Sequence, residues 1–382
     1  MLRDKVDKIS PKELSVSIDE LPREGSNFSA FFNVVCLIAG AGTLGMPDSF
    51  KSGGWISIGF IFLSGLASWY TGTLIIECLY YRPGSRLQDY PSIGEAAFGI
   101  AGRRVLMTFH YAIMLGVATL FIMLSGQNLQ SFSSDRGFEI NERIWIAIAG
   151  SCVLIPYATT KSMKEVAGMS VIGVATTVIT VIISCTVGLL DFKNQGVINR
   201  ELINWVGIPT SLATIGFSFG GTVIYTHVEA SMRHPKMWPY VLAMALGSVS
   251  ILYLLMGSTG YLVYGDKVLN PILNSLPSSI AVDIAFIIIT LHLVATAPLP
   301  LTSFSLEFER LLKIEDAVLV RVCTRVLIVT MLTLIAAFLP YFGKFMALVG
   351  ALSNWYWSIL LLYYATSSYL VGEIAPCILT FL

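Results

Sequence analysis

Residues 40–47 read GAGTLGMP and residues 217–222 read FSFGGT, and each stretch lies inside an apolar segment of membrane length. Glycine and proline interrupt helices, and a backbone amide left unpaired in hydrocarbon is costly. Such interruptions persist where the exposed backbone groups line a cavity and bind a ligand. Two of them at corresponding places in the two halves of a chain indicate the substrate site of a secondary transporter. The alternative is a close-packing surface between helices, but that surface usually has GxxxG spacing rather than GxG or GG.

The composition is that of a membrane protein. Of 382 residues, 55% are hydrophobic and 13% are charged, and the mean hydropathy is +0.74. Soluble domains carry about 25% charged residues. The net charge is zero, which argues against a nucleic-acid partner. The six cysteines lie in or beside apolar runs without a CxxC pair, so we interpret them as small buried side chains rather than metal ligands or disulfides.

Ten uncharged windows approach or exceed the length of about 20 residues that a membrane helix needs. They are 25–47, 52–76, 105–134, 144–160, 166–190, 202–228, 237–265, 284–306, 326–343 and 345–372. Lys and Arg are concentrated in the segments that are cytosolic if the N-terminus is cytosolic, so the positive-inside rule places both ends in the cytosol. We therefore expect a flexible cytosolic tail over 1–27, a transmembrane domain over 28–372 and a short C-terminal remnant over 373–382.

The two glycine stretches lie in the first and sixth windows, so the ten spans divide into five plus five. Because five is odd, the second half must enter the membrane with opposite polarity, as in an inverted-topology repeat. A broken helix leaves one helix N-terminus, which suits a carboxylate, and one C-terminus, which suits an ammonium group. An α-amino acid carries both groups on one carbon. The breaks therefore favour an amino acid as the substrate.

In their wider context the two stretches resemble the amino acid/auxin permease family. Residues 31–56 read FFNVVCLIAGAGTLGMPDSFKSGGWI and residues 216–241 read GFSFGGTVIYTHVEASMRHPKMWPYV, close to the first and sixth spans of that family. Further similarity lies in YLVYGDKVLNPILNSLP (261–277), LHLVATAPLPLTSFSLEFERLL (291–312) and PYFGKFMALVGALSNW (340–355). The resemblance is nearest to the vacuolar and vesicular branch. It implies an all-α, LeuT-like five-plus-five fold with discontinuous helices 1 and 6, and transport of small, neutral amino acids that is often driven by protons.

The same resemblance implies a set of site residues. The substrate-binding backbone maps onto Ala39, Gly40, Ala41, Gly42 and Thr43 in the first span and onto Ser218, Phe219, Gly220, Gly221 and Thr222 in the sixth. Thr296 falls where sodium-coupled relatives use a threonine hydroxyl for the ion, but Cys36 replaces their asparagine. A thiol is a poor ligand for a hard cation such as Na⁺, so we expect proton coupling.

Titratable side chains at membrane depth are candidates for that coupling. Asp48, near the outer interface, is either an interfacial charge beside Lys51 or an outer gate and proton acceptor. His110 and His292 lie deeper, in the third and eighth spans, as packing residues or as proton carriers. His227 and Glu229, at the cytosolic end of the sixth span, are either a solvated helix end or a proton-linked inner gate; we read them as the former.

These observations predict a multi-pass integral membrane transporter that works by alternating access, with no cofactor. The sequence contains no catalytic constellation, so an enzyme is not expected. A sodium-coupled transporter, an exchanger and a non-transporting amino acid sensor remain alternatives. The family has an eleventh helix, for which this chain has no segment before Leu382. A vacuolar or endomembrane location follows from the branch resemblance, whereas the particular amino acid, the direction of transport and the oligomeric state stay open.

Overall fold

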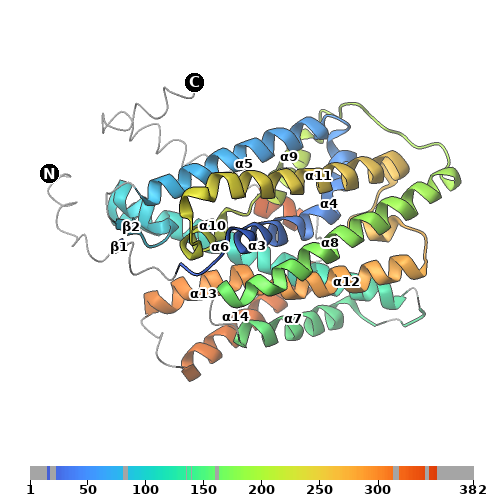
Figure 1. Ribbon diagram of the computed structural model, residues 1–382. Coiled ribbons are helices and arrows are strands. Elements are labelled where there is room, and N and C mark those ends of the chain that lie inside the picture. The colour runs from blue at the N-terminus through green and yellow to red at the C-terminus, as the bar shows by residue number, and fades with distance from the viewer. Residues whose placement is uncertain are drawn as a thin grey trace.

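The computed structural model is a bundle of helices with one short two-stranded sheet (Figure 1). It describes residues 15–17, 23–80, 85–134, 136–138, 140–159, 163–312, 318–339 and 344–350. The longer elements are β1 (Ser15–Ser17), α3 (Asn27–Ala39), α4 (Ala41–Gly53), α5 (Ser57–Leu79), β2 (Ser85–Leu87), α6 (Tyr90–Ser134), α7 (Glu142–Thr159), α8 (Met163–Asp191), α9 (Ile208–Ser218), α10 (Thr222–Ser231), α11 (Trp238–Tyr264), α12 (Ile280–Thr296), α13 (Pro298–Leu312) and α14 (Val318–Phe338). Single-turn helices η2 (Phe192–Asn194), η3 (Pro235–Met237), η4 (Gly265–Lys267) and η5 (Ile272–Ser275) lie in the connections.

Both glycine stretches interrupt a helix. The first break is at Gly40, whose ψ of −102° lies outside the helical region, and the axes of α3 and α4 differ by 44° there. The second break is the segment from Phe219 to Gly221, between α9 and α10. Pro47 does not end a helix as its place in the sequence suggested, and it lies inside α4. A proline removes one hydrogen bond of the ladder, which a helix can tolerate as a kink.

The structure places a helix or a broken helix in each of the first nine predicted windows. Six of these helices are long and apolar enough to cross a membrane, and the broken pair α3–α4 makes a seventh candidate span. The tenth window and the C-terminal remnant, 373–382, lie almost entirely outside the described residues. α6 starts earlier than the window at 105, because its first part, from Tyr90, continues across a bend at Gly99 with a φ of 68°.

The long helices form two groups around the breaks. α4 packs on α9 and α11, and α11 also packs on α3 and α5. On the other side, α6 and α7 pack on each other and on α12 and α14. In Figure 1, α5 and α11 run along one side of the bundle, α7, α12 and α14 along the other, with α3 and α4 between them. α8 contacts both groups, through α3 and α11 on one side and α12 on the other.

Part of the segment before the first helix is ordered. β1 pairs antiparallel with β2, with Val16 opposite Arg86. Nearer to α3, the Gly25 amide donates to the Ser231 carbonyl at 2.7 Å, and the Arg233 amide donates to the Gly25 carbonyl at 2.8 Å. The predicted flexible tail over 1–27 thus contains a strand and a backbone attachment to the end of α10. The start of α3 and the end of α10 are tied together by this attachment.

Candidate functional site

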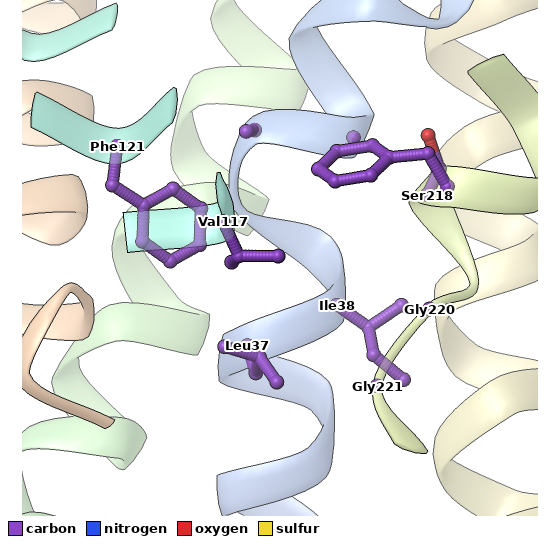
Figure 2. Close-up of a pocket in the computed structure, with 10 residues that line it drawn as sticks. Leu37, Ile38, Val117, Phe121, Ser218, Gly220 and Gly221 are labelled. Carbon is purple, nitrogen blue, oxygen red and sulfur yellow. The ribbon is translucent and has the colours of Figure 1, made fainter. Parts of the chain in front are cut away.

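A small pocket lies between the two breaks. It is lined by Leu37, Ile38, Ala41 and Gly42 from α3 and α4, by Phe217 and Ser218 from the end of α9, by Gly220 and Gly221 from the second break, and by Val117 and Phe121 from α6. Figure 2 shows Val117 and Phe121 on one side of the α3–α4 helix and Ser218, Gly220 and Gly221 on the other. The cavity volume is about 20 Å³, which is room for about one water molecule.

The helix ends at this pocket have complementary electrostatics. α4 begins at Ala41 and α10 at Thr222, and each N-terminus carries a partial positive charge. α3 ends at Ala39 and α9 at Ser218, and each C-terminus carries a partial negative charge. The side chains that line the pocket carry no formal charge. The site therefore offers backbone dipoles of both signs within an otherwise apolar wall.

Tyr253 on α11 connects the two breaks. Its hydroxyl lies 2.6 Å from the Ile38 carbonyl of α3 and 2.7 Å from the Ser218 carbonyl of α9, and it is fully buried. A phenol has one proton, so it donates to one of these carbonyls at a time. The Phe219 ring packs edge-on against the Tyr253 ring at 5.2 Å. Tyr253 thus holds the ends of two broken helices beside each other.

Five of the ten predicted substrate residues line the pocket: Ala41, Gly42, Ser218, Gly220 and Gly221. The other five lie in or beside the breaks but do not line it. A Cβ on Gly40 would meet the His292 ring, while the Phe219 carbonyl accepts from the Ser68 hydroxyl at 3.0 Å. Ala39, Thr43 and Thr222 are buried, and the Thr43 hydroxyl donates to the Ala39 carbonyl at the end of α3.

Gly42 lies at a close approach of the two broken helices. A Cβ at this position would be 2.4 Å from the Tyr253 hydroxyl oxygen and 2.8 Å from the Ser218 Cβ. Contacts this short do not occur between real side chains, so any larger residue must displace Tyr253 or Ser218. A glycine is required here by the close approach of α4, α9 and α11.

The four coupling candidates lie in three different places. Thr296 and His292 lie on α12 behind the first break, where the Cys36 sulfur is 3.3 Å from the Thr296 hydroxyl and this hydroxyl donates to the His292 carbonyl at 2.7 Å. Asp48 is far along α4, where it accepts a hydrogen bond from the Asn270 amide at 3.0 Å. His110 is buried on α6 beside Glu307 of α13. The structure therefore brings only Thr296 and His292 together.

His227 and Glu229, read from the sequence as a solvated helix end, are both bonded to other elements. Glu229 forms a buried ion pair with Arg86 at 2.9 Å and accepts a hydrogen bond from the Tyr80 hydroxyl at 2.5 Å. The Arg23 guanidinium in turn donates to the Tyr80 oxygen at 3.0 Å. His227 lies 3.0 Å from Glu307. The Glu229 carboxylate is buried and the His227 imidazole keeps only part of its surface exposed, and both fasten α10 to its neighbours.

Sequence reasoning missed several residues of the site. Tyr253 lies in a long apolar run of α11 with no local feature that distinguishes it from other tyrosines. Val117 and Phe121 come from α6, which carries no break at that point. Phe217 begins the second glycine-containing stretch of the sequence, and it lines the pocket. Only tertiary packing identifies Tyr253, Val117 and Phe121 as residues of the site.

The family match and the most similar relatives found by sequence are all amino acid transporters. The family profile described as "Transmembrane amino acid transporter protein" matches residues 23–369. Amino acid transporter AVT1D of Arabidopsis thaliana is 26% identical over 376 residues, covering 91% of this chain and 66% of the relative. Amino acid transporter AVT1I of the same plant is 28% identical over 357 residues, covering 90% and 87%. This chain thus spans slightly less than two thirds of AVT1D, and the match covers 62% of another relative, AVT1C.

Solved structures with the same fold are transporters. The closed form of Mhp1, a nucleobase-cation-symport-1 family transporter with bound bromovinylhydantoin, has a TM-score of 0.57 at 14% identity and covers 89% of this chain and 78% of its own. A substrate-bound, outward-open Na⁺-coupled sialic acid symporter has a TM-score of 0.59 at 12% identity and covers 91% and 81%. At these identities the likeness shows the fold alone. The fold is the LeuT-like arrangement that the family resemblance implied.

Proposed function

The chain belongs to the transmembrane amino acid transporter family, and from this premise we propose that it is a secondary active transporter of small, neutral amino acids. It works by alternating access and is coupled to protons. It is a multi-pass integral membrane protein, and we place it in a vacuolar or other endomembrane, in line with the branch that its sequence resembles. The observation that carries the proposal is the pocket between the two broken helices.

The chemistry of the pocket supports an amino acid with an uncharged side chain. The substrate's carboxylate is matched by the N-termini of α4 and α10, and its ammonium group by the carbonyl ends of α3 and α9. The wall around them consists of apolar side chains such as Leu37, Val117 and Phe121. A charged substrate side chain would have to leave water without a partner in this wall, which is unfavourable. Neutral side chains are therefore favoured.

The size of the pocket supports alternating access. Room for about one water molecule is too little for any amino acid, so the broken helices must move before a substrate enters. α3 and α10 are tied to each other at one end of the bundle by the Gly25 backbone bonds, so they are suited to move together against α6, α12 and α14. Such rocking of one helix group against another around a central site is the usual working cycle of broken-helix transporters.

The contact between Cys36 and Thr296 supports proton rather than sodium coupling. In this structure the Cys36 thiol and the Thr296 hydroxyl form a hydrogen bond at 3.3 Å. The same hydroxyl donates a hydrogen bond to the His292 carbonyl. Sodium prefers several oxygen ligands, and sulfur is a poor one. We therefore propose that uptake proceeds without Na⁺.

Exchange of labelled substrate in proteoliposomes tests the proposed activity. Vesicles loaded with unlabelled alanine, glycine, proline or leucine are diluted into a trace of the tritiated amino acid, without an ion gradient. Counterflow of at least one of them above that of protein-free vesicles is expected. A saturable binding signal without any counterflow would contradict transport and would favour the amino acid sensor.

A further inference from the structure

Glu307 differs from the other buried glutamates in the described part of the chain by the kind of cation beside it. Glu229 is paired with Arg86, Glu309 with Arg325 and Glu95 with Arg103. Arginine stays charged at any physiological pH, so these pairs are permanent. The cationic groups beside Glu307 are two histidines, and an imidazole, unlike a guanidinium, occurs in both a neutral and a charged form in proteins. This carboxylate therefore has partners that can gain and lose a proton.

The three groups meet at one carboxylate oxygen. Glu307 Oε1 lies 3.0 Å from His227 Nε2 and 3.4 Å from His110 Nε2. The second oxygen, Oε2, is buried and makes no hydrogen bond to any residue that the structure describes. His110 and Glu307 are almost completely buried, whereas the His227 side chain keeps 17% of its surface exposed. His227 is thus the member of the cluster that reaches water.

The cluster links α10, which also packs on α3 and α5, to α6 and α13. Glu307 is on α13 and His110 on α6, in the group that includes α7 and α14, whereas His227 is on α10. His227 follows Gly221 by six residues, and His110 precedes Val117 by seven, so each is about 10 Å along its helix from the pocket lining. Movement of α10 away from α6 and α13 separates His227 from Glu307.

The surrounding groups leave the protonation of this cluster to the histidines. On α6, the Tyr90 ring stacks on His110 at 5.4 Å and Tyr111 lies close to both His110 and Glu307. Phenols are neutral at physiological pH, since their ordinary pKa is about 10. Near Tyr111, the Asp89 carboxylate accepts a hydrogen bond from the Ser92 amide at 3.0 Å, and Arg103 is paired with Glu95. On α10 and α13, Glu229 and Glu309 are held by their own arginines. Arg310 lies at the exposed end of α13 beside Gln88.

With one proton the cluster is a carboxylate, one imidazolium and one neutral imidazole, and its net charge is zero. Without that proton it is a buried negative charge, which a low-dielectric interior disfavours. We propose that Glu307, shared by His110 and His227, is the proton-binding site that couples transport to the pH gradient. It holds one proton while α10 is closed against α6 and α13. When α10 withdraws, the N–H bond of the His227 imidazolium breaks and the proton passes to water on that side.

This inference rests on the proposed proton-coupled transport. Two readouts distinguish failure of the Glu307 proton site from failure of proton-coupled transport itself. Proteoliposomes containing the wild type, Glu307→Gln or His227→Gln are tested with tritiated alanine, or with the best substrate from the counterflow panel. Counterflow without a gradient reports folding and substrate binding, and accumulation under a gradient of one pH unit reports coupling. His234→Gln is the matched control, because it makes the same change at an exposed histidine beyond the end of α10.

For one proton per substrate, one pH unit drives accumulation of about tenfold in the wild type and in His234→Gln. Glu307→Gln and His227→Gln are expected to keep counterflow within about twofold of the wild type while accumulating no more than the equilibrium amount. If Glu307→Gln does not fold, the result for His227→Gln decides. Proton-driven accumulation by both variants at the wild-type level would overturn the inference and leave proton-coupled transport standing. Absence of proton-driven accumulation in the wild type would overturn both.

Discussion

Replacing Tyr253 by phenylalanine tests whether the two breaks are held together as the structure indicates. The substitution removes one oxygen and keeps the ring, including its edge-on contact with Phe219. What is lost is the donor to the Ile38 and Ser218 carbonyls, at 2.6 and 2.7 Å. Both carbonyls are at the ends of broken helices next to the pocket, and the Tyr253 side chain that bonds to them is fully buried.

The expected size of the effect follows from counting bonds. Because a phenol has one proton, one hydrogen bond is lost rather than two. Leaving a buried carbonyl without its donor costs about 1–3 kcal/mol. The part of this energy that depends on closure of the two breaks around the substrate appears in binding, and the rest appears in the stability of the substrate-free protein. If the whole energy appeared in binding, the substrate concentration that gives half-maximal counterflow would rise about 5- to 150-fold.

The measurement is concentration-dependent counterflow, together with the thermal stability of the purified protein in detergent. Tyr240→Phe is the control, because it makes the same chemical change on the same helix at a side chain that is 68% exposed. Tyr253→Phe is expected to weaken apparent affinity and to lower the melting temperature by a few degrees, and Tyr240→Phe to change neither. Equal behaviour of the two variants would refute the bridging role of Tyr253.

Three further substitutions test other parts of the account. Gly42→Ala should abolish counterflow, and the loss should be smaller in a Tyr253→Phe background because the hydroxyl that a new Cβ would meet at 2.4 Å is gone; Gly247→Ala, at a glycine with nothing within 4 Å, is the control, and equal losses in both backgrounds would contradict the contact. Arg325→Met should cost about 3–5 kcal/mol because it leaves Glu309 buried and unpaired, and adding Glu309→Gln should recover most of the loss in thermal stability; no recovery would argue against a direct pair. Burial, and then the hydrogen bond and charge of Glu229, raise the pKa of Tyr80 from 10.0 to about 12, so the stability that this bond adds is fully present below pH 10 and is lost only as the pH rises through about 12. The stability difference between the wild type and Tyr80→Phe should therefore be the same at pH 6 and pH 9, and a difference that shrinks by pH 9 would contradict it.

The breaks could be predicted because their cause is local. Glycine at 40 and at 220–221 leaves the backbone free to depart from the helix wherever it stands, and the apolar residues around it place the break at membrane depth. The exact position in the first span could not be predicted so well. Pro47 looked like a breaker from its sequence, but a proline that lacks only one hydrogen bond stays inside α4, and Gly40 carries the non-helical ψ.

The partners of the breaks and of the buried charges could not be predicted, because they come from distant segments. Tyr253 meets Ile38 across 215 positions of the sequence. Each uncharged window ends next to a charged residue, so Glu307 lies just outside the window 284–306. Packing against α6 and α10 buries it instead and provides histidines as partners. The sequence likewise predicts Glu229 in a solvated helix end, although Arg86 and Tyr80 contact it and it is buried. Rules that treat charge as exposed fail where a partner from another element neutralises it.

The most direct test of proton-coupled amino acid transport is the movement of protons caused by the substrate itself. Sealed proteoliposomes that enclose a pH-sensitive dye, in buffer without Na⁺ and without any imposed gradient, are given alanine or the best substrate from the counterflow panel. If transport is coupled to protons, the internal pH changes as soon as the substrate is added, the change saturates with substrate concentration, and it is absent from protein-free vesicles. An unchanged internal pH, together with uptake of the same substrate that requires Na⁺, would contradict this coupling.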